Sequence, residues 1–360
     1  LVHQRGEVAR QPERVGQRGR NHDLLAEQGR HMRGQPPLPC LDERRKQLMF
    51  QDILYNFSFL TTAVNLQDEN IFSNYAVWLF ELLCNLMKDL DRDRIKVQMV
   101  DHYQVLSLFA DELFKGEQID LAKSYLQKAI LVTEDAVDNI EVSQQFLQGR
   151  HVPIRKAYLN ALLRSDTAKA TQIIRDAESS GIPLEEIYED IIRLTMLEVG
   201  ELWHQNKITV DKEHYCTSTT QMILSLFYPT IFNQPSKPKK IVTCCIGSEL
   251  HEMGGRMVSD LFEYHGWESI FLGSAVPTNA LVHAIGEHKP NLVALSVTMP
   301  QYLGLCHEAV LAIRKAHPAT LIAVGGRAFS TSNKIYERWP VDIHTDLATE
   351  LIDWADKVVK

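Results

Sequence analysis

His251 is the residue whose position most clearly suggests a metal ligand. His251 follows a short β-rich run, residues 240–246, and the carboxylate of Glu249 precedes it by two positions. Imidazole is a common metal ligand, and a carboxylate that accepts the other ring N–H fixes the tautomer and raises the basicity of the ligating nitrogen. Gly254 comes next and leaves room for a bulky group. The segment therefore predicts a metal-ligating histidine beside a large ligand.

Two further motifs of small residues stand at matching places downstream. Forty-one residues separate Gly254 from Ser296, which with Thr298 ends a later β-rich run. Twenty-six residues then separate Thr298 from the pair Gly325 and Gly326, which ends the next run. Because ligands of open α/β sheets bind at the carboxyl ends of the strands, we expect all three motifs at one ligand-binding edge.

The segments that must position these motifs alternate between β-strand and α-helix patterns. Helical segments separate five short β-rich runs, at residues 240–246, 269–272, 292–297, 321–324 and 341–344. Alternating strands and helices predict a parallel sheet with helices on both faces. We therefore expect a flavodoxin-like, doubly wound α/β domain over residues 241–360.

The motif set resembles that of the cobalamin-binding domain, whose pattern is Asp-x-His-x-x-Gly, then Ser-x-Leu, then Gly-Gly at these separations. The resemblance implies that His251 ligates the lower face of cobalt in place of the cofactor's own base. The displaced nucleotide tail would pass Gly254 towards Ser296 and the two glycines. Two residues depart from the pattern: Glu249 stands in place of Asp, and Thr298 in place of Leu. Both changes are mild, since the carboxylate is kept and threonine is compact and β-branched.

A second group of residues belongs to the helical text before the α/β domain. Trp203 and His204 end one predicted helix. Nine residues separate Trp203 from Glu213, which with His214 lies in the first turn of the next helix. A short helix–helix connection brings these side chains to one end of the pair. The alternative, without any binding function, is a buried tryptophan beside acidic residues that lie near the start of a helix.

This spacing looks like the Trp-x9-Glu-His signature of cobalamin-dependent, light-responsive transcription repressors. That resemblance implies that Trp203 packs on the adenosyl group of adenosylcobalamin and that Glu213 hydrogen-bonds its ribose. It also implies that His204 ligates cobalt on the upper face after light breaks the carbon–cobalt bond. The helices of residues 151–232 would then be a four-helix-bundle cap above the corrin ring.

The remaining boundaries follow from composition. Residues 233–240 carry two prolines and three lysines and are predicted to be a linker. The sequence pattern of residues 46–150 predicts an all-helical domain. Residues 1–45 include nine arginines, seven of them within the first forty positions, and show no apolar periodicity. They are expected to be a disordered leader or sequence translated from upstream of a true start at Met32 or Met49. The fold class is thus multidomain, with two helical parts before the α/β domain.

The helical domain together with a cobalamin domain resembles the photocobilins, light sensors that pair a biliverdin-binding helical domain with cobalamin. A bilin needs an aromatic slot and a polar partner for its propionates, for which His102 is a candidate. Cys84 falls in a helix that is predicted to be buried, so we expect no covalent attachment. The aromatic residues available for the slot are Tyr55, Phe57, Phe59, Trp78, Phe80 and Tyr103. The alternative is a dimerisation or spacer domain in which these same residues simply form the core.

Composition limits the function classes. The net charge is −8 and residues 49–150 contain no basic recognition helix, so direct binding of nucleic acid is not expected. No apolar run is long enough to span a membrane. The cysteines form no CxxC motif and follow no signal peptide, which predicts a reduced, cytoplasmic setting.

Two functions follow from the resemblances. The first is a light sensor, not an enzyme, in which photolysis of adenosylcobalamin changes domain packing and the state of a homo-oligomer. Its downstream effector is not identified by the sequence. The alternative is a corrinoid shuttle subunit that carries methyl groups between methyltransferases, with a similar bundle before the same domain.

Overall fold

The computed structural model describes residues 43–136, 144–248 and 250–360, with side chains from residue 53 onward. These residues form two compact units. The first unit combines the helical N-terminal part with two short segments, Met299–Gly304 and Arg327–Arg338. The second unit holds the helical bundle and the rest of the α/β domain. The predicted leader lies outside the described residues up to residue 42.

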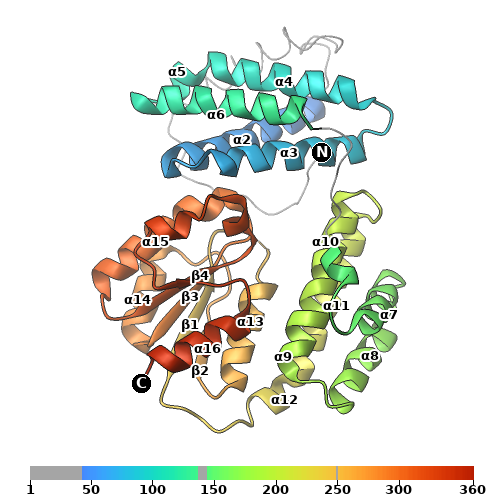
Figure 1. Ribbon diagram of the computed structural model, residues 1–360, viewed down its shortest axis with the longest axis vertical. Coiled ribbons are helices and arrows are strands. Elements are labelled where there is room, and N and C mark those ends of the chain that lie inside the picture. The colour runs from blue at the N-terminus through green and yellow to red at the C-terminus, as the bar shows by residue number, and fades with distance from the viewer. Residues whose placement is uncertain (1–42, 137–143, 249) are drawn as a thin grey trace. The chain divides into compact units, whose positions relative to one another are not determined.

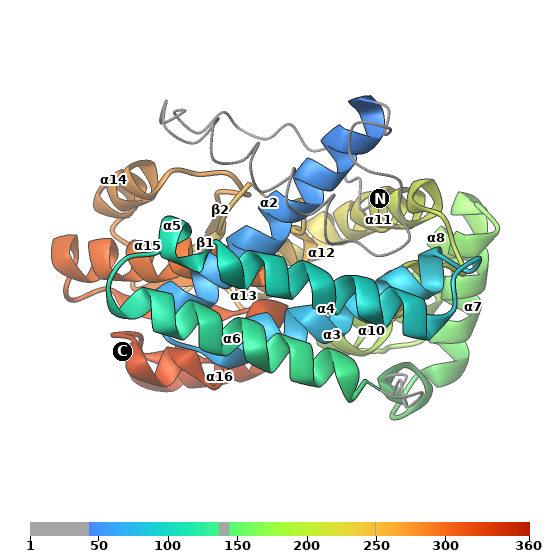
Figure 2. The same ribbon diagram turned by 90° about the horizontal axis from the view of Figure 1, so that it is seen from above.

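The N-terminal part of the first unit is entirely helical, as predicted. Asp68 caps one helix by accepting from Asn70 N at 3.1 Å, and Asp91 caps the next by accepting from Arg94 N at 2.7 Å. Figure 2 shows two of the helices, α4 and α6, side by side. The helices are α2 (Glu43–Leu66), α3 (Glu69–Leu86), α4 (Arg92–Leu108), α5 (Ala110–Leu113) and α6 (Glu117–Glu134).

The second unit begins with the bundle (Figure 1). Asp166 caps α8 through Lys169 N at 2.9 Å, as its position before a helical run predicts. The third helix is continuous through a π-helical segment, η3. The bundle consists of α7 (Val152–Leu163), α8 (Thr167–Ser179), the rod α9–η3–α10 (Leu184–Glu186, Ile187–Arg193 and Leu194–His204), and α11 (Val210–Leu224) with η4 (Ser225–Phe227) and α12 (Tyr228–Ile231).

The sheet of the α/β domain has the order β2-β1-β3-β4-β5, and all four pairings are parallel. This is the flavodoxin-like order. The strands are β1 (Lys240–Cys245), β2 (Glu268–Phe271), β3 (Leu292–Ser296), β4 (Leu321–Gly325) and β5 (Ile343–His344). The fifth strand is shorter than the predicted run 341–344, because only Ile343 and His344 pair with β4.

Helices cover both faces of this sheet (Figure 1). α13 (Met253–Tyr264) and α16 (Ala348–Val358) pack against each other on one face. α14 (Thr278–His288) and α15 (Leu303–Ala316) cover the other face, as right-handed crossovers require. Within the described part of the chain, no helix is both long and apolar enough to cross a bilayer.

Candidate functional site

The carboxyl edge of the sheet aligns two of the predicted motifs. In the parallel register Ser296 stands opposite Cys245 on one side and Gly325 on the other. Backbone hydrogen bonds continue this row, with Ile246 N donating to Ser296 O and Val297 N to Gly325 O, both at 2.9 Å. The end of β1, from which the His251 loop departs, and the motifs after β3 and β4 therefore share one edge.

His251 lies in the loop between β1 and α13, two residues before the helix begins, and is half-buried. Its neighbour Leu250 is 62% exposed. The neighbouring loop after β2 supports this loop: Ser274 Oγ donates to Glu252 Oε2 at 3.4 Å. Glu249 lies outside the described residues, so its contact with the imidazole stays a prediction.

The first turn of α13 carries two glycines with different roles. A Cβ placed on Gly254 would meet nothing within 4 Å, so the space predicted beside this residue is open. A Cβ on Gly255 would lie 2.5 Å from Cys245 Sγ, and 3.8 Å from Ser296 Cβ. Gly255 therefore lets α13 approach the sheet, a requirement that our sequence analysis missed although two consecutive glycines after a strand signal it.

The Gly325–Gly326 pair is shaped by backbone contacts within the domain. A Cβ on Gly325 would come within 2.8 Å of Thr345 O. Gly326 has φ +102°, and a Cβ there would lie 2.4 Å from Val297 O. Both positions thus exclude a side chain, which keeps the backbone of this turn close to the top of β3.

The second predicted group lies at the connection between α10 and α11. Trp203 and His204 are the last residues of α10, and Glu213 and His214 are in the first turn of α11. Since α11 leads directly into α12 and the linker, this connection lies at the opposite end of α11 from the linker (Figure 1). Thr209 occupies the N-cap position of α11, and its side chain makes no cap hydrogen bond.

The polar groups at this connection have local partners. His204 is only 6% exposed, and its Nδ1 lies 4.0 Å from Glu201 Oε1. Glu213 accepts from Thr217 Oγ1 at 2.8 Å, while its other oxygen lies beside His214 Nδ1. The imidazole of His204 therefore lies inside this end of the bundle, beside Glu201.

At the linker end, polar contacts fasten the bundle to the α/β domain. Tyr188, in η3, donates its hydroxyl to Asp260 at 3.3 Å. Burial raises the pKa of Asp260 to about 6. Glu189 accepts from both the backbone N and the hydroxyl of Thr349, at 3.0 and 2.7 Å, in the first turn of α16. The bundle is thus anchored at one end.

The linker itself is held by the same domain. Asp356, in α16, accepts from Lys237 at 2.7 Å, from Lys239 at 3.1 Å and from the indole of Trp267 at 3.0 Å. These partners lower the pKa of the Asp356 carboxyl against the opposing effect of its burial. The linker is therefore fastened to α16.

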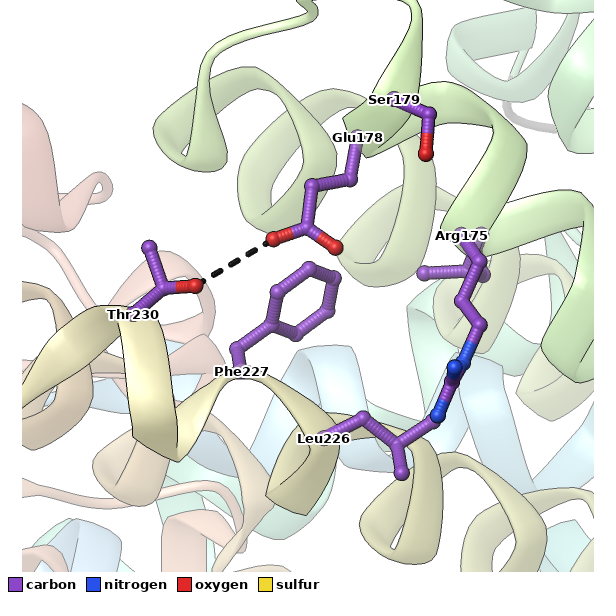
Figure 3. Close-up of a pocket in the computed structure, with 7 residues that line it drawn as sticks. Arg175, Glu178, Ser179, Leu226, Phe227 and Thr230 are labelled. Atoms are coloured by element: carbon purple, nitrogen blue, oxygen red, sulfur yellow. Dashed lines mark hydrogen bonds between the residues drawn. The ribbon is translucent and has the colours of Figure 1, made fainter.

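A pocket of about 210 Å³ lies at the linker end of the bundle, between α8 and the η4–α12 segment (Figure 3). Glu178 and Thr230 close one side through a hydrogen bond of 3.4 Å. Phe227 forms the floor between them and Arg175. None of the residues predicted to hold cobalamin lines this pocket.

The aromatic residues of the helical domain pack largely on one another. Phe59 stacks on Tyr75 with centroids 3.8 Å apart, and Tyr103 meets Phe72 edge-on at 5.7 Å. Of the predicted bilin contacts, Phe59, Phe80 and Tyr103 are buried, while Tyr55, Phe57 and Trp78 keep partial exposure.

The two polar candidates in this domain depart from their expected roles. Burial lowers the pKa of His102 to about 4, so it is neutral at pH 7 and lacks the charge that a propionate prefers. Cys84, near the C-terminal end of α3, is half-buried rather than buried, and partial burial raises the pKa of its thiol.

Comparison with known proteins assigns the two parts of the second unit. Residues 239–345 match the family model of the B12 binding domain. Residues 154–227 match a second B12 binding domain model, which corresponds to the bundle.

Individual relatives fall into two groups. The HTH-type transcriptional repressor CarH of Myxococcus xanthus is 24% identical over 191 residues, which cover 52% of this chain and 62% of the repressor. The trimethylamine corrinoid protein of Methanosarcina barkeri is 26% identical over 142 residues, which cover 39% of this chain and 65% of that protein. The chain thus spans less than two thirds of the length of either relative.

A solved structure shares the fold. The monomethylamine corrinoid protein of Methanosarcina barkeri superposes with a TM-score of 0.52 at 18% identity, over 57% of this chain and 99% of the other. The chain therefore contains a helical B12 binding domain at residues 154–227 and an α/β B12 binding domain at residues 239–345, and cobalamin is the cofactor that both support.

Proposed function

We propose that this chain is a light sensor that binds adenosylcobalamin and changes its domain packing and oligomeric state when illuminated. The observation that carries the proposal is the placement of Trp203 and His204 at the end of α10 and of Glu213 and His214 at the start of α11, in a bundle that precedes an α/β B12 binding domain. The match to a CarH repressor supports the same conclusion.

The residues at the sheet edge fit a corrinoid. The half-buried His251, the exposed Leu250 and the open space beside Gly254 leave a face where a large planar group can rest. In this proposal His251 would be a nitrogen ligand to the cobalt, and Glu249 would set its tautomer. Ser296, Thr298 and the Gly325–Gly326 turn would receive the nucleotide end.

When bound, adenosylcobalamin supplies a cobalt–carbon bond that light can break. On the protein side, Trp203 would pack on the adenosyl group and Glu213 would accept from its ribose. After light, the imidazole of His204, which now lies beside Glu201, would supply a nitrogen ligand to the cobalt. Because the linker end of the bundle is anchored through Asp260 and Thr349, the cap would pivot there. Such differential contacts are what a population shift requires.

The test is an absorption spectrum of the full chain reconstituted in the dark with adenosylcobalamin, followed by size-exclusion chromatography before and after green light. We expect the adenosylcobalamin bands to bleach and the elution volume to change together. A spectrum and an elution volume that light leaves unchanged would reject the sensor function.

A corrinoid shuttle subunit is the second candidate, and the match to trimethylamine corrinoid proteins favours it. The two functions differ in the upper ligand. Preference for adenosylcobalamin over methylcobalamin supports the sensor, whereas methyl transfer to a partner methyltransferase supports the shuttle. Neither function makes the chain alone an enzyme.

A bilin in the helical domain is a further part of the proposal. What supports it is the partial exposure of Tyr55, Phe57 and Trp78, whereas the mutual packing of Phe59 and Tyr75 favours the alternative of a spacer or dimerisation domain. Expression with biliverdin tests it: a red-absorbing band that copurifies supports the bilin, and its absence from protein that binds cobalamin supports the spacer.

A further inference from the structure

Two segments of the first unit originate at the carboxyl edge of the sheet. Met299–Gly304 follows β3 immediately after Thr298, and Arg327–Arg338 follows β4 immediately after Gly326. Both segments belong to the same compact unit as the helices α2–α6. The chain therefore passes from residues assigned to the nucleotide end of cobalamin into the helical domain within one residue.

Each segment is bound to the helices through its backbone. Thr62 Oγ1, in α2, donates to Gln301 O at 3.1 Å, and Asn74 Nδ2, in α3, donates to Thr331 O at 2.9 Å. Hydrogen bonds to backbone atoms depend on where the loop runs rather than on which side chains it carries. A shift of either loop would therefore disturb the helices directly.

Asp68 joins the second segment to the start of α3. This carboxylate is only 4% exposed. One oxygen accepts from Asn70 N at 3.1 Å as the helix cap, and the other accepts from Asn333 N at 2.8 Å. Arg338 lies 3.8 Å from the second oxygen and also donates to Leu66 O at 3.1 Å. One buried carboxylate thus closes both the helix and the loop.

We propose that Asp68, with the segments 299–304 and 327–338, couples cobalamin occupancy to the helical domain. The inference rests on the proposed cobalamin site, because a ligand that fixes the turns at Thr298 and Gly326 also fixes the two segments that follow them. Linkage makes the coupling reciprocal: whatever factor cobalamin adds to the stability of the Asp68 contacts, those contacts add to cobalamin affinity. Cobalamin binding would then change the stability of the helical domain directly through these two segments.

The test compares the full chain with two matched cap variants, all in the dark. Asp68→Asn keeps an N-cap oxygen for α3, since Asn caps as well as Asp, but removes the charge facing Asn333 and Arg338. Asp91→Asn makes the same change at the cap of α4, which contacts only Arg94 N among the bonds described above. Arg338→Gln removes the guanidinium and retains the carboxylate.

Two quantities are measured: adenosylcobalamin affinity, and hydrogen exchange of peptides spanning residues 69–75 and 327–338. We expect cobalamin to slow exchange in both peptides about tenfold, and Asp68→Asn and Arg338→Gln to reduce this protection and to weaken binding about fivefold or more. Asp91→Asn should match the unmodified chain in both.

The outcomes distinguish a failure of the coupling from a failure of the cobalamin site. Cobalamin that binds with a shifted spectrum but leaves exchange at residues 69–75 unchanged overturns the coupling and leaves the cobalamin site intact. The coupling is also overturned if Asp68→Asn and Arg338→Gln bind adenosylcobalamin as tightly as the unmodified chain and show the same protection from exchange. A chain that binds no cobalamin overturns the proposed site and, with it, the coupling. Because all measurements are made in the dark, the light response does not enter.

Discussion

The hydroxyl of Tyr188 in the bundle donates to the carboxylate of Asp260 in α13 at 3.3 Å, with both side chains buried. This contact joins the two B12 binding domains near their linker. It places an ionisable group where the charged form is poorly hydrated, and burial accordingly raises the pKa of Asp260 from 3.8 to about 6.

This shift predicts an unusual pH dependence of stability. The folded pKa of Asp260 exceeds its unfolded value, so its contribution favours the folded chain most at low pH and is lost as pH rises through about 6. Asp260→Asn keeps an acceptor for Tyr188 and removes the ionisation. Between pH 5 and pH 8, the free energy of unfolding of the variant should gain about 1–3 kcal/mol relative to the unmodified chain.

Urea unfolding of the apo chain across this pH range measures the effect. Asp353→Asn, an exposed change on α16, is the control and should track the unmodified chain. Parallel pH profiles for Asp260→Asn and the unmodified chain would show that the carboxyl is not held in the poorly hydrated state described here.

The two glycines of α13 should separate stability from ligand binding. Gly255→Ala places a methyl group 2.5 Å from Cys245 Sγ and should destabilise the apo chain by about 1–3 kcal/mol. Gly254→Ala meets nothing within 4 Å and should leave the apo chain as stable or up to about 1 kcal/mol more stable, since alanine favours the helix. Gly254→Val should nevertheless weaken cobalamin binding.

Thermal unfolding and cobalamin titration of these variants check the separation. The account fails at this point if Gly254→Val binds cobalamin as tightly as the unmodified chain, or if Gly255→Ala is as stable as Gly254→Ala.

Removal of the proposed lower ligand should weaken cobalamin retention. His251→Ala is expected to lose at least about tenfold to a hundredfold in affinity, because substitutions one shell further out already cost this much at metal sites. His283→Ala, an exposed histidine on α14, is the matched control. Equilibrium dialysis with hydroxocobalamin measures both, and equal retention by the two variants would exclude His251 as a ligand.

The role of His204 is limited to the illuminated state. His204→Ala should bind adenosylcobalamin in the dark like the unmodified chain and bleach at the same rate, because the proposal gives this imidazole a ligand role only after the carbon–cobalt bond is broken. After light, the bound cobalamin should dissociate faster and its spectrum should lack a second axial nitrogen ligand. An illuminated spectrum identical to that of the unmodified chain removes this role.

Much of the fold is legible in the sequence because its signals are local. The β-rich runs before His251 and Gly325 lie within two residues of the observed strands, and Asp166 caps its helix as its position predicts. The separations between the sheet-edge motifs place Ser296 and Gly325 in one row, since parallel strands of similar length end together.

The features that the sequence does not reveal depend on contacts between residues that are far apart along the chain. The contact between Asp68 and Asn333 spans 265 positions and depends on a loop path that no local pattern encodes. The requirement at Gly255 arises from Cys245 on the neighbouring strand, so the glycine alone does not distinguish it from Gly254. The neutral state of His102 likewise follows from burial, which depends on how α4 packs.

The most direct test of the central claim is the electron paramagnetic resonance spectrum of the chain labelled uniformly with ¹⁵N and loaded with unlabelled cobalamin reduced to the cobalt(II) state. A protein histidine bound to cobalt splits each cobalt line into a doublet, and the account predicts this doublet in the unmodified chain and its loss in His251→Ala. A triplet, which arises from the ¹⁴N of the cofactor's own base, would contradict the account.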